Sequence, residues 1–327
     1  MKEGGTIVKV DEGTDPKHGK KPEERSIDEL LRLGVTVIDK PCGPSSHEVT
    51  AWARKIVGAE KAGHSGTLDP HVSGVLPVGL NSATKAMGFL LKSKKEYVGI
   101  MQLHRNVKEG DVKRAFEAFT GEIRQLPPVR SAVRRRERKR KVYYMEPLQY
   151  KGREVLFLVG CEAGTYIRKL CFDIGRHLGV GANMLELRRT RAGALTEKMS
   201  VTLHDLSDAV WLWKERNDEK ALRRCVLPLE AAVDLRRVWV RDSAVESLCS
   251  GAALALPGIA RIELGVMPGE SIALMSLKGE LVCIARSEMG SEGMAAGMKG
   301  IAARTARVIM EKGTYPKMWK TSEKKEG

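Results

Sequence analysis

The pattern of apolar residues changes once along the 327-residue chain, near Asp234. Before Asp234, segments with helical spacing alternate irregularly with apolar runs of strand length. This predicts a mixed sheet with helices rather than a regular β-α-β array. After it, short apolar runs at 238–240, 271–277 and 281–285 surround one helical segment at 243–250. We therefore expect an α+β domain followed by a small, mainly β domain of about 85 residues.

Capping residues and glycines set the helix ends that we expect. A Ser or Asp before an apolar stripe accepts the first free N–H groups of a helix, and a following glycine adopts the left-handed conformation that ends it. These signals predict three helices: Ser46 to Gly58 with Ser46 as N-cap, Asp111 to Gly121 with Asp111 as N-cap, and Ile167 to Gly179. They also predict a shorter helix at 26–33 capped by Ser26. We expect strands at 35–38 and 155–161 and a hairpin at Lys278-Gly279.

The charge balance points to a polyanionic partner. The chain has 56 Lys and Arg against 41 Asp and Glu, a formal net charge of +15. Basic side chains on phosphates release condensed counterions, which favours binding. The densest basic run predicts a solvated loop that meets RNA or DNA, and a membrane surface is disfavoured because no amphipathic apolar face accompanies it. This run contains Arg134, Arg135, Arg136, Arg138, Lys139, Arg140 and Lys141.

Cysteine spacing and the missing apolar runs exclude several protein classes. The six cysteines form no C-x-x-C pair and have no histidine at zinc spacing, so we expect reduced thiols, no disulfide framework and no structural zinc. No apolar run reaches the length of about 18 residues that a membrane span needs. The N-terminus also lacks the apolar core of a secretory signal. These features predict a cytoplasmic protein.

The densest cluster of special residues surrounds Asp69. Glycines and prolines between Gly63 and Pro77 predict a tightly bent loop, followed by an apolar strand. An Asp held in such a loop is either a catalytic carboxylate or a turn-forming residue. The composition of the loop leaves these two alternatives equal.

Five blocks of residues, in order along the chain, resemble the motifs of TruB-type pseudouridine synthases. The segment around Asp69 is similar to the nucleophile motif of that family. Because all five blocks keep the family's order, a chance match is excluded and the catalytic alternative is favoured. The blocks are IDKPCGPSS (38–46), GHSGTLDP with SGVLPV (63–70 and 73–78), KEYV (95–98), AGTYIRKL with DIG (163–170 and 173–175) and ELRRTR (186–191).

The resemblance implies that Asp69 attacks the uridine nucleotide covalently, with no cofactor and no metal. Such a carboxylate must be ionised in a pocket that excludes water, and burial alone would raise its pKa. Arg168 matches the family's pairing partner. A guanidinium stays protonated and can bind both carboxylate oxygens, so it suits this role.

Two tyrosines match residues that contact the target base in the family. The resemblance implies that Tyr166 accepts a proton during the rearrangement. It implies that Tyr97 stacks on the target base, which must leave its helical stack to reach the nucleophile. A half-buried core tyrosine is the plain alternative for Tyr166.

Three further residues are expected to bind substrate by the same resemblance. Leu187 would pack against the flipped base, with an ordinary core leucine as the alternative. His64 matches a histidine that helps to displace the base, and a histidine that braces the loop is an equal alternative. Lys40, with Pro41, would brace the catalytic loop and contact phosphate.

The C-terminal segment resembles a PUA domain, an RNA-binding pseudobarrel. The whole pattern is most similar to archaeal dyskerin-type synthases, the catalytic subunits of H/ACA guide-RNA particles, and the segments 130–136 and 143–144 favour that branch. Departures from the family at Asn183 and Ala194-Leu195 lie outside the catalytic set. The PUA-like segments are 243–252, 256–259, 267–270, 277–281 and 313–319.

This resemblance implies an α+β fold with a mixed, mainly antiparallel sheet flanked by helices, plus a small β pseudobarrel. We expect an N-terminal extension at 1–33 that packs on the C-terminal domain, a catalytic domain at 34–234, a PUA domain at 235–320 and a disordered tail at 321–327.

The resemblance also implies the partners. These are an H/ACA guide RNA, a substrate rRNA or tRNA, a zinc-ribbon-like small subunit, a glycine-arginine-rich subunit and a ribosomal-type protein that binds kink-turns. Two alternatives stay open. One is a stand-alone modifier of tRNA or rRNA uridines, and the other is a non-catalytic RNA-binding scaffold, which the intact catalytic set disfavours.

Overall fold

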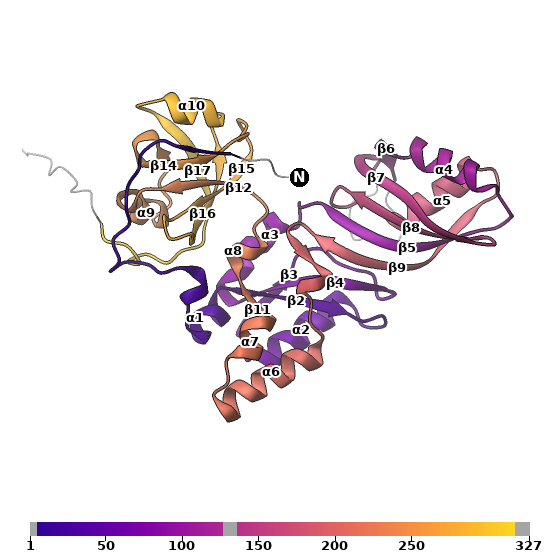
Figure 1. Cartoon of the computed structure of the whole chain (residues 1–327), viewed down its shortest axis with the longest axis horizontal. Helices are drawn as coiled ribbons and strands as arrows, with labels where there is room; N and C mark the ends of the chain where they lie inside the picture. The colour runs from indigo at the N-terminus through magenta and orange to yellow at the C-terminus, as the bar shows by residue number, and fades with distance from the viewer. Residues whose placement is uncertain (1–4, 127–135, 318–327) are drawn as a thin grey trace, which may run out of the picture. The chain divides into compact units, whose positions relative to one another are not determined.

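The computed structural model describes residues 5–126 and 136–317, which form two compact units (Figure 1). The larger unit contains residues 35–80 and 87–226. The smaller unit contains residues 5–34, 81–86 and 227–317, so it combines segments from both ends of the described chain. Strand β11 (Val226–Pro228) lies where the chain leaves the larger unit for the last time.

The larger unit is built on a mixed sheet with strand order β2-β4-β9-β5-β8-β7-β6. Strands β4 and β9 run parallel, and the other neighbouring pairs along this path are antiparallel. This confirms the expected mixed, mainly antiparallel sheet. The strands are β2 (Gly34–Lys40), β3 (Ala62–His64), β4 (Val72–Leu80), β5 (Lys95–Leu103), β6 (Gly121–Gln125), β7 (Arg138–Lys151), β8 (Glu154–Cys161), β9 (Ala182–Ala192) and β10 (Leu195–Thr196), of which β3 pairs with β4 and β10 with β9.

Helices bury apolar stripes against this sheet. In α5, Ile167, Leu170 and Ile174 recur at helical spacing and are fully buried, which is the pattern of a helix with one face in the core. Phe116 of α4 meets Phe157 of β8 edge to face, with ring centroids 6.1 Å apart. The helices with residues in this unit are α2 (Ser46–Val57), α3 (Thr84–Leu90), α4 (Glu109–Ala118), α5 (Ile167–His177), α6 (Leu203–Arg216) and α7 (Lys220–Cys225).

Two expected helix caps are wrong. Helix α2 is capped by Ser45, whose hydroxyl accepts from the N–H of Glu48 while the Glu48 carboxylate accepts from the N–H of Ser45. Ser46 is instead the first helical residue and is buried. Helix α4 begins at Glu109 after Lys108, and Asp111 lies inside its first turn. The expected end of α2 is confirmed, because Gly58 has φ +70°.

The basic run is not simply a solvated loop. Arg138 to Lys141 form the start of β7, where β6 supplies a pairing strand and exposed basic side chains alternate along the ladder. Lys139 pairs with Glu122 at 2.9 Å. Arg134 and Arg135 lie outside the described residues.

The smaller unit contains a seven-stranded sheet of order β1-β14-β12-β15-β16-β17-β13. The expected hairpin is confirmed, because β15 and β16 pair antiparallel around a turn where Gly279 has φ +85°. The strands are β1 (Thr6–Val8), β12 (Arg236–Val240), β13 (Leu254–Ala255), β14 (Ile259–Glu263), β15 (Ser271–Met275), β16 (Leu281–Ser287) and β17 (Ile301–Val308), and the helices are α1 (Ile27–Arg32), α8 (Leu229–Ala232), α9 (Asp242–Cys249) and α10 (Ser291–Ala296).

The N-terminal segment is integrated into this smaller unit. Strand β1 pairs with β14. The buried Arg25 guanidinium binds both carboxylate oxygens of Glu230, at 2.8 and 2.9 Å. The ammonium of Lys278 donates to main-chain carbonyls of residues 15, 16, 18 and 19. The part of the chain described here contains no helix with the length and apolar character needed to cross a bilayer.

Candidate active site

The loop that carries Asp69 leaves β3 at His64 and enters β4 at Val72. The buried Arg189 side chain of β9 holds this loop, donating from Nε to Val75 O at 2.7 Å and from Nη2 to Gly66 O at 3.0 Å. Gly74 has φ +100°, and a Cβ there would lie 2.2 Å from the carbonyl oxygen of Arg189. Only glycine allows this close approach of β4 to β9.

The side chain of Lys40 braces the Asp69 loop. Its side chain is 0% exposed, and its ammonium donates to the carbonyls of Pro41 at 2.8 Å, Pro70 at 3.1 Å and Val72 at 2.8 Å. These bonds use all three ammonium donors. Burial lowers the pKa of Lys40. The expected phosphate contact of Lys40 therefore does not fit this structure, whereas loop bracing does.

A second brace comes from Ser46 in the first turn of α2. Its hydroxyl accepts from Leu68 N at 2.8 Å and donates to Leu68 O at 3.0 Å. The hydroxyl thus fixes both main-chain polar groups of the residue before Asp69. This explains why the hydroxyl is not available as a helix cap.

The central contact joins Asp69 to Arg168, 99 positions further along the chain. Nη2 of Arg168 donates to Oδ2 of Asp69 at 2.6 Å. The distance is slightly below the range of about 2.7–2.9 Å that is usual for a charge-assisted N–H···O bond. Among the described residues, no side chain or main-chain group donates to the second oxygen, Oδ1. Both side chains are 57% exposed, so these residues do not by themselves form the expected water-excluding pocket.

Tyr166 lies at the N-cap position of α5, two residues before Arg168. The amide side chain of Gln125, at the end of β6, bonds to its main chain twice. Oε1 of Gln125 accepts from Tyr166 N at 3.0 Å, and Nε2 donates to Tyr166 O at 3.2 Å. The start of α5, with the residues expected to act on the base, is therefore tied to β6.

Tyr97 and Leu187 lie in one buried cluster with Leu68 and Val72, which flank the nucleophile loop. Tyr97 is 9% exposed. Burial raises the pKa of its phenol, and the nearby Arg189 partly opposes this. The phenol is therefore neutral at physiological pH. The packing of Leu187 also agrees with its plain alternative as a core residue.

His64 begins the loop and is half-buried. Its Nε2 lies 3.3 Å from the hydroxyl of Thr67, and its ring meets that of His47 edge to face at 4.8 Å. Burial, followed by the neighbouring His47 and Arg189, lowers the pKa of His64. The imidazole is therefore neutral at neutral pH. The contact with Thr67 supports its alternative as a brace of the loop.

Three residues that support the site, Ser46, Arg189 and Gln125, have no predicted role in it. The sequence predicts Ser46 as a helix cap and Arg189 as part of a matching block, and it predicts nothing for Gln125. No local pattern marks Gln125, because its partner lies 41 positions away. Within residues 5–126 and 136–317, no group of three His, Cys, Asp or Glu is arranged to hold a metal ion.

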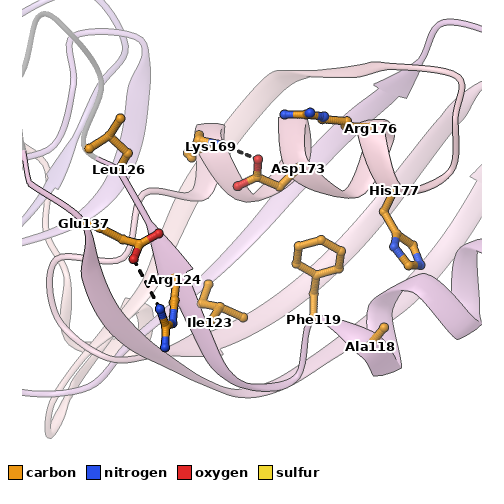
Figure 2. Close-up of a pocket in the computed structure, with 10 residues that line it drawn as sticks. All are labelled: Ala118, Phe119, Ile123, Arg124, Leu126, Glu137, Lys169, Asp173, Arg176 and His177. Carbon is orange, nitrogen blue, oxygen red and sulfur yellow. Dashed lines mark hydrogen bonds and ion pairs between the residues drawn. The ribbon is translucent and has the colours of Figure 1, made fainter.

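A separate cavity of about 570 Å³ lies between α4, β6 and α5 of the larger unit (Figure 2). Two ion pairs border it, Arg124 with Glu137 and Lys169 with Asp173. None of the expected site residues lines it, so it is not the site described above. Its lining residues are Ala118, Phe119, Ile123, Arg124, Leu126, Glu137, Lys169, Asp173, Arg176 and His177.

Four family models match successive parts of the chain. The DKCLD (NUC011) domain matches residues 3–50, and the N-terminal domain of TruB family pseudouridylate synthases matches residues 54–167. The C-terminal domain of tRNA pseudouridylate synthase B matches residues 168–234, and the PUA domain matches residues 236–309.

Curated relatives match over almost the full length. The probable tRNA pseudouridine synthase B of Methanopyrus kandleri is 52% identical over 314 residues, which cover 96% of this chain and 93% of the relative. The protein of the same description from Archaeoglobus fulgidus is 49% identical over 323 residues, covering 98% and 99%.

Solved structures also match almost the whole chain. A chain of "Structure of H/ACA RNP bound to a substrate RNA containing 2'-deoxyuridine" has a TM-score of 0.91 and 47% identity, covering 97% of this chain and 98% of that one. A chain of "Crystal Structure of a Cbf5-Nop10-Gar1 Complex" has a TM-score of 0.93 and 49% identity, with 97% of each chain covered.

Proposed function

The chain belongs to the TruB family of pseudouridine synthases, and we propose that it converts uridine to pseudouridine in rRNA under the direction of an H/ACA guide RNA, with Asp69 as the covalent nucleophile. The observation that carries the chemistry is the 2.6 Å contact between Arg168 and Asp69, because it joins two residues of separate family motifs at one place.

The guanidinium of Arg168 is the proposed charge partner of the Asp69 carboxylate. It bonds to Oδ2 and leaves Oδ1 to attack the nucleotide. Both side chains are more than half exposed, so the RNA itself has to exclude water from them. Displacement of that water strengthens the contact between the two charges.

The isomerisation breaks the bond between the ribose and the uracil nitrogen and forms one to a uracil carbon. The bond that Asp69 forms to the nucleotide breaks during this exchange. The hydrogen on that carbon leaves as a proton, and the freed uracil nitrogen takes up a proton from solvent, so the product is an isomer of uridine. Tyr166 is the group that we propose to accept the proton from the carbon, because it lies on the same segment as Arg168. Tyr97 and Leu187 are proposed to contact the flipped base, since both lie in the cluster that flanks the Asp69 loop. His64 is proposed to help displace the base.

Guide dependence is supported by similarity over the whole chain. The matched chain with a TM-score of 0.91 comes from an H/ACA ribonucleoprotein bound to a substrate RNA, and its match covers 97% of this chain. The PUA match at residues 236–309 adds an RNA-binding domain. From the complexes in which the structural relatives occur, we propose subunits of the Nop10 and Gar1 type as protein partners. The resemblance of the sequence adds a ribosomal-type protein that binds kink-turns as a further proposed partner.

Guide-independent action on tRNA is a second candidate. The observation that favours it is that relatives of 52% and 49% identity are described as probable tRNA pseudouridine synthase B. The two candidates share the active site and differ in what delivers the uridine.

The nucleophile is tested with Asp69→Asn, which keeps the size of the side chain and removes its charge. We expect no pseudouridine from this variant, with RNA affinity within about threefold of the unchanged protein, because the contact area is the same. Asp208→Asn is the matched control, since Asp208 is an exposed residue of α6 outside the motif blocks. Substantial activity in Asp69→Asn would exclude Asp69 as nucleophile.

The delivery of substrate is tested by assaying the full chain on rRNA fragments and on tRNA, each with and without guide RNA and the two partner subunits. We expect rRNA modification only with guide RNA. Equal rRNA modification without guide RNA would reject guide dependence and leave the stand-alone alternative.

A further inference from the structure

Gln125 is the last residue of β6, and its side chain contacts the N-cap residue of α5. The residue is 2% exposed, yet both polar atoms of its amide are satisfied by one main-chain partner, Tyr166. A buried amide that bonds to both sides of a single residue fixes that residue's orientation, because it contacts the peptide group before it and the one after it.

The residue that this contact holds is the N-cap of α5. Tyr166 occupies the N-cap position, but its own side chain makes no cap hydrogen bond. The carbonyl of Tyr166 also accepts from Leu170 N at 2.9 Å, which is the first helical bond. The two bonds from Gln125 therefore act where the direction of α5 is set.

The pair of Arg168 and Asp69 cannot fix its own geometry. Both side chains are 57% exposed. Exposed ion pairs contribute at most about 1 kcal/mol, which is too little to hold a long side chain in one place. The position of Arg168 therefore depends on the main chain that carries it, and Gln125 holds that main chain two residues earlier.

The same edge of the sheet contacts the preceding loop at a second point. Gln125 is the register partner of Arg138 in the β6–β7 pair. Two residues further along β7, the guanidinium of Arg140 covers Gly164, where φ is +79° and an added Cβ would lie 3.2 Å from Nη2. The β6–β7 pair thus packs on the segment from Gly164 to Tyr166 from one side.

We propose that Gln125 is a positioning residue for pseudouridine formation, which sets the start of α5 so that Arg168 meets Asp69. The inference rests on the proposed roles of these two residues. It assigns Gln125 no contact with RNA, so it predicts a loss of rate without a matching loss of affinity.

The first test is Gln125→Ala in the full chain with its guide RNA and partners. We expect the single-turnover rate to fall about 10- to 100-fold, because misplacement of a reacting group by about 1 Å has an effect of this size. The dissociation constant for substrate RNA should change less than about threefold. An unchanged rate, or a loss that lies wholly in affinity, would overturn the proposal.

The second test is Gln125→Glu, which is isosteric and also covers the case that the Ala variant does not fold. A neutral carboxyl can accept from Tyr166 N and donate to Tyr166 O, whereas a carboxylate can only accept. Burial raises the pKa of a carboxyl group. The rate of Gln125→Glu relative to the unchanged protein should therefore rise as the pH falls from 8 to 5.5. A ratio independent of pH would contradict the proposed role of the two bonds between Gln125 and Tyr166.

Gln149→Glu is the matched control, because Gln149 is an exposed residue of β7 and the same charge change there touches no part of the site. Its rate relative to the unchanged protein should not depend on pH. If the ratio rises for Gln149→Glu as it does for Gln125→Glu, the effect comes from net charge, and the proposed role of the bonds between Gln125 and Tyr166 is rejected.

A double-variant cycle tests whether Gln125 acts through Arg168. We expect Gln125→Ala combined with Arg168→Ala to be no slower than Arg168→Ala alone, because the positioned group is already missing. If the rate losses of the two single variants add fully in the double variant, Gln125 does not act through Arg168. If Asp69→Asn is inactive while Gln125→Ala is unaffected, only this inference fails, and activity in Asp69→Asn would instead contradict the proposed nucleophile.

Discussion

Replacing Lys40 by Met tests whether one buried ammonium holds the nucleophile loop in place. The two side chains have similar length, so the change removes the charge and its three donors without opening a large cavity. The ammonium of Lys40 bonds to the carbonyls of Pro70 and Val72, which follow Asp69 in the chain, and to the carbonyl of Pro41.

The expected magnitude follows from these contacts. The carbonyl of Pro70 keeps a second donor, Gly43 N at 2.9 Å. The carbonyls of Pro41 and Val72 lose the donor that Lys40 supplied, at about 1–3 kcal/mol each. Removing a buried charge returns part of this free energy. We therefore expect Lys40→Met to lower the free energy of unfolding by about 2–4 kcal/mol.

Activity should fall as well, because Asp69 directly precedes Pro70, whose carbonyl loses one of its donors. A loop shift of about 1 Å would lower the rate about 100-fold. Urea unfolding and single-turnover kinetics measure the two effects, with Lys55→Met as control, since Lys55 is exposed in the last turn of α2. A loss below about 1 kcal/mol together with normal activity would refute the role of the ammonium.

Three further predictions concern single side chains. Ser46→Ala should lower the free energy of unfolding by about 1–3 kcal/mol and slow catalysis, because the N–H of a buried loop residue loses its acceptor; equal urea midpoints would contradict this. Arg25→Ala should lower the free energy of unfolding of the smaller unit, measured in urea, by about 3–5 kcal/mol, because the buried Glu230 carboxylate loses its cation and keeps the N–H of Leu281. Arg25→Ala with Glu230→Gln should lower it less, because the buried charge is then gone. Burial, with a neighbouring carboxylate, raises the pKa of Tyr144 to about 12. The protonated phenol is thus favoured in the folded state, so its stabilisation is present below about pH 10 and lost between about pH 10 and 12. Tyr144→Phe should show a smaller loss of thermal stability over that range, and an unchanged loss would refute this assignment.

Local signals predicted most of the elements but not all of their ends. Gly58 and the apolar stripe of α5 were read correctly, because both depend on residues close in sequence. Ser46 was misread because its hydroxyl is used by Leu68, a residue 22 positions away. The strand β7 was missed because its first residues are charged, and only pairing with β6 makes them a strand.

Prediction of the active site depended more strongly on the family resemblance than prediction of the helices and strands did. The residues themselves left Asp69 between a nucleophile and a turn former, and nothing in their spacing placed Arg168 beside it. The motifs of the TruB family brought them together, and the structure has them in contact. The buried state of Lys40 and the role of Gln125 depend on packing between distant segments, which a single sequence does not encode in any local pattern.

The ammonium of Lys40 is one of several that bond to backbone carbonyls. That of Lys95 donates to the carbonyls of Leu90, Leu91 and Ser93, and that of Lys278 donates to four in the N-terminal segment. Each ammonium binds several carbonyl oxygens, as a coordinated potassium ion would. Unlike such an ion, it is joined to the main chain by four methylenes and cannot be removed by dialysis. The net charge of +15 therefore overstates the charge free to meet RNA. High salt should release the RNA while these loops keep their shape.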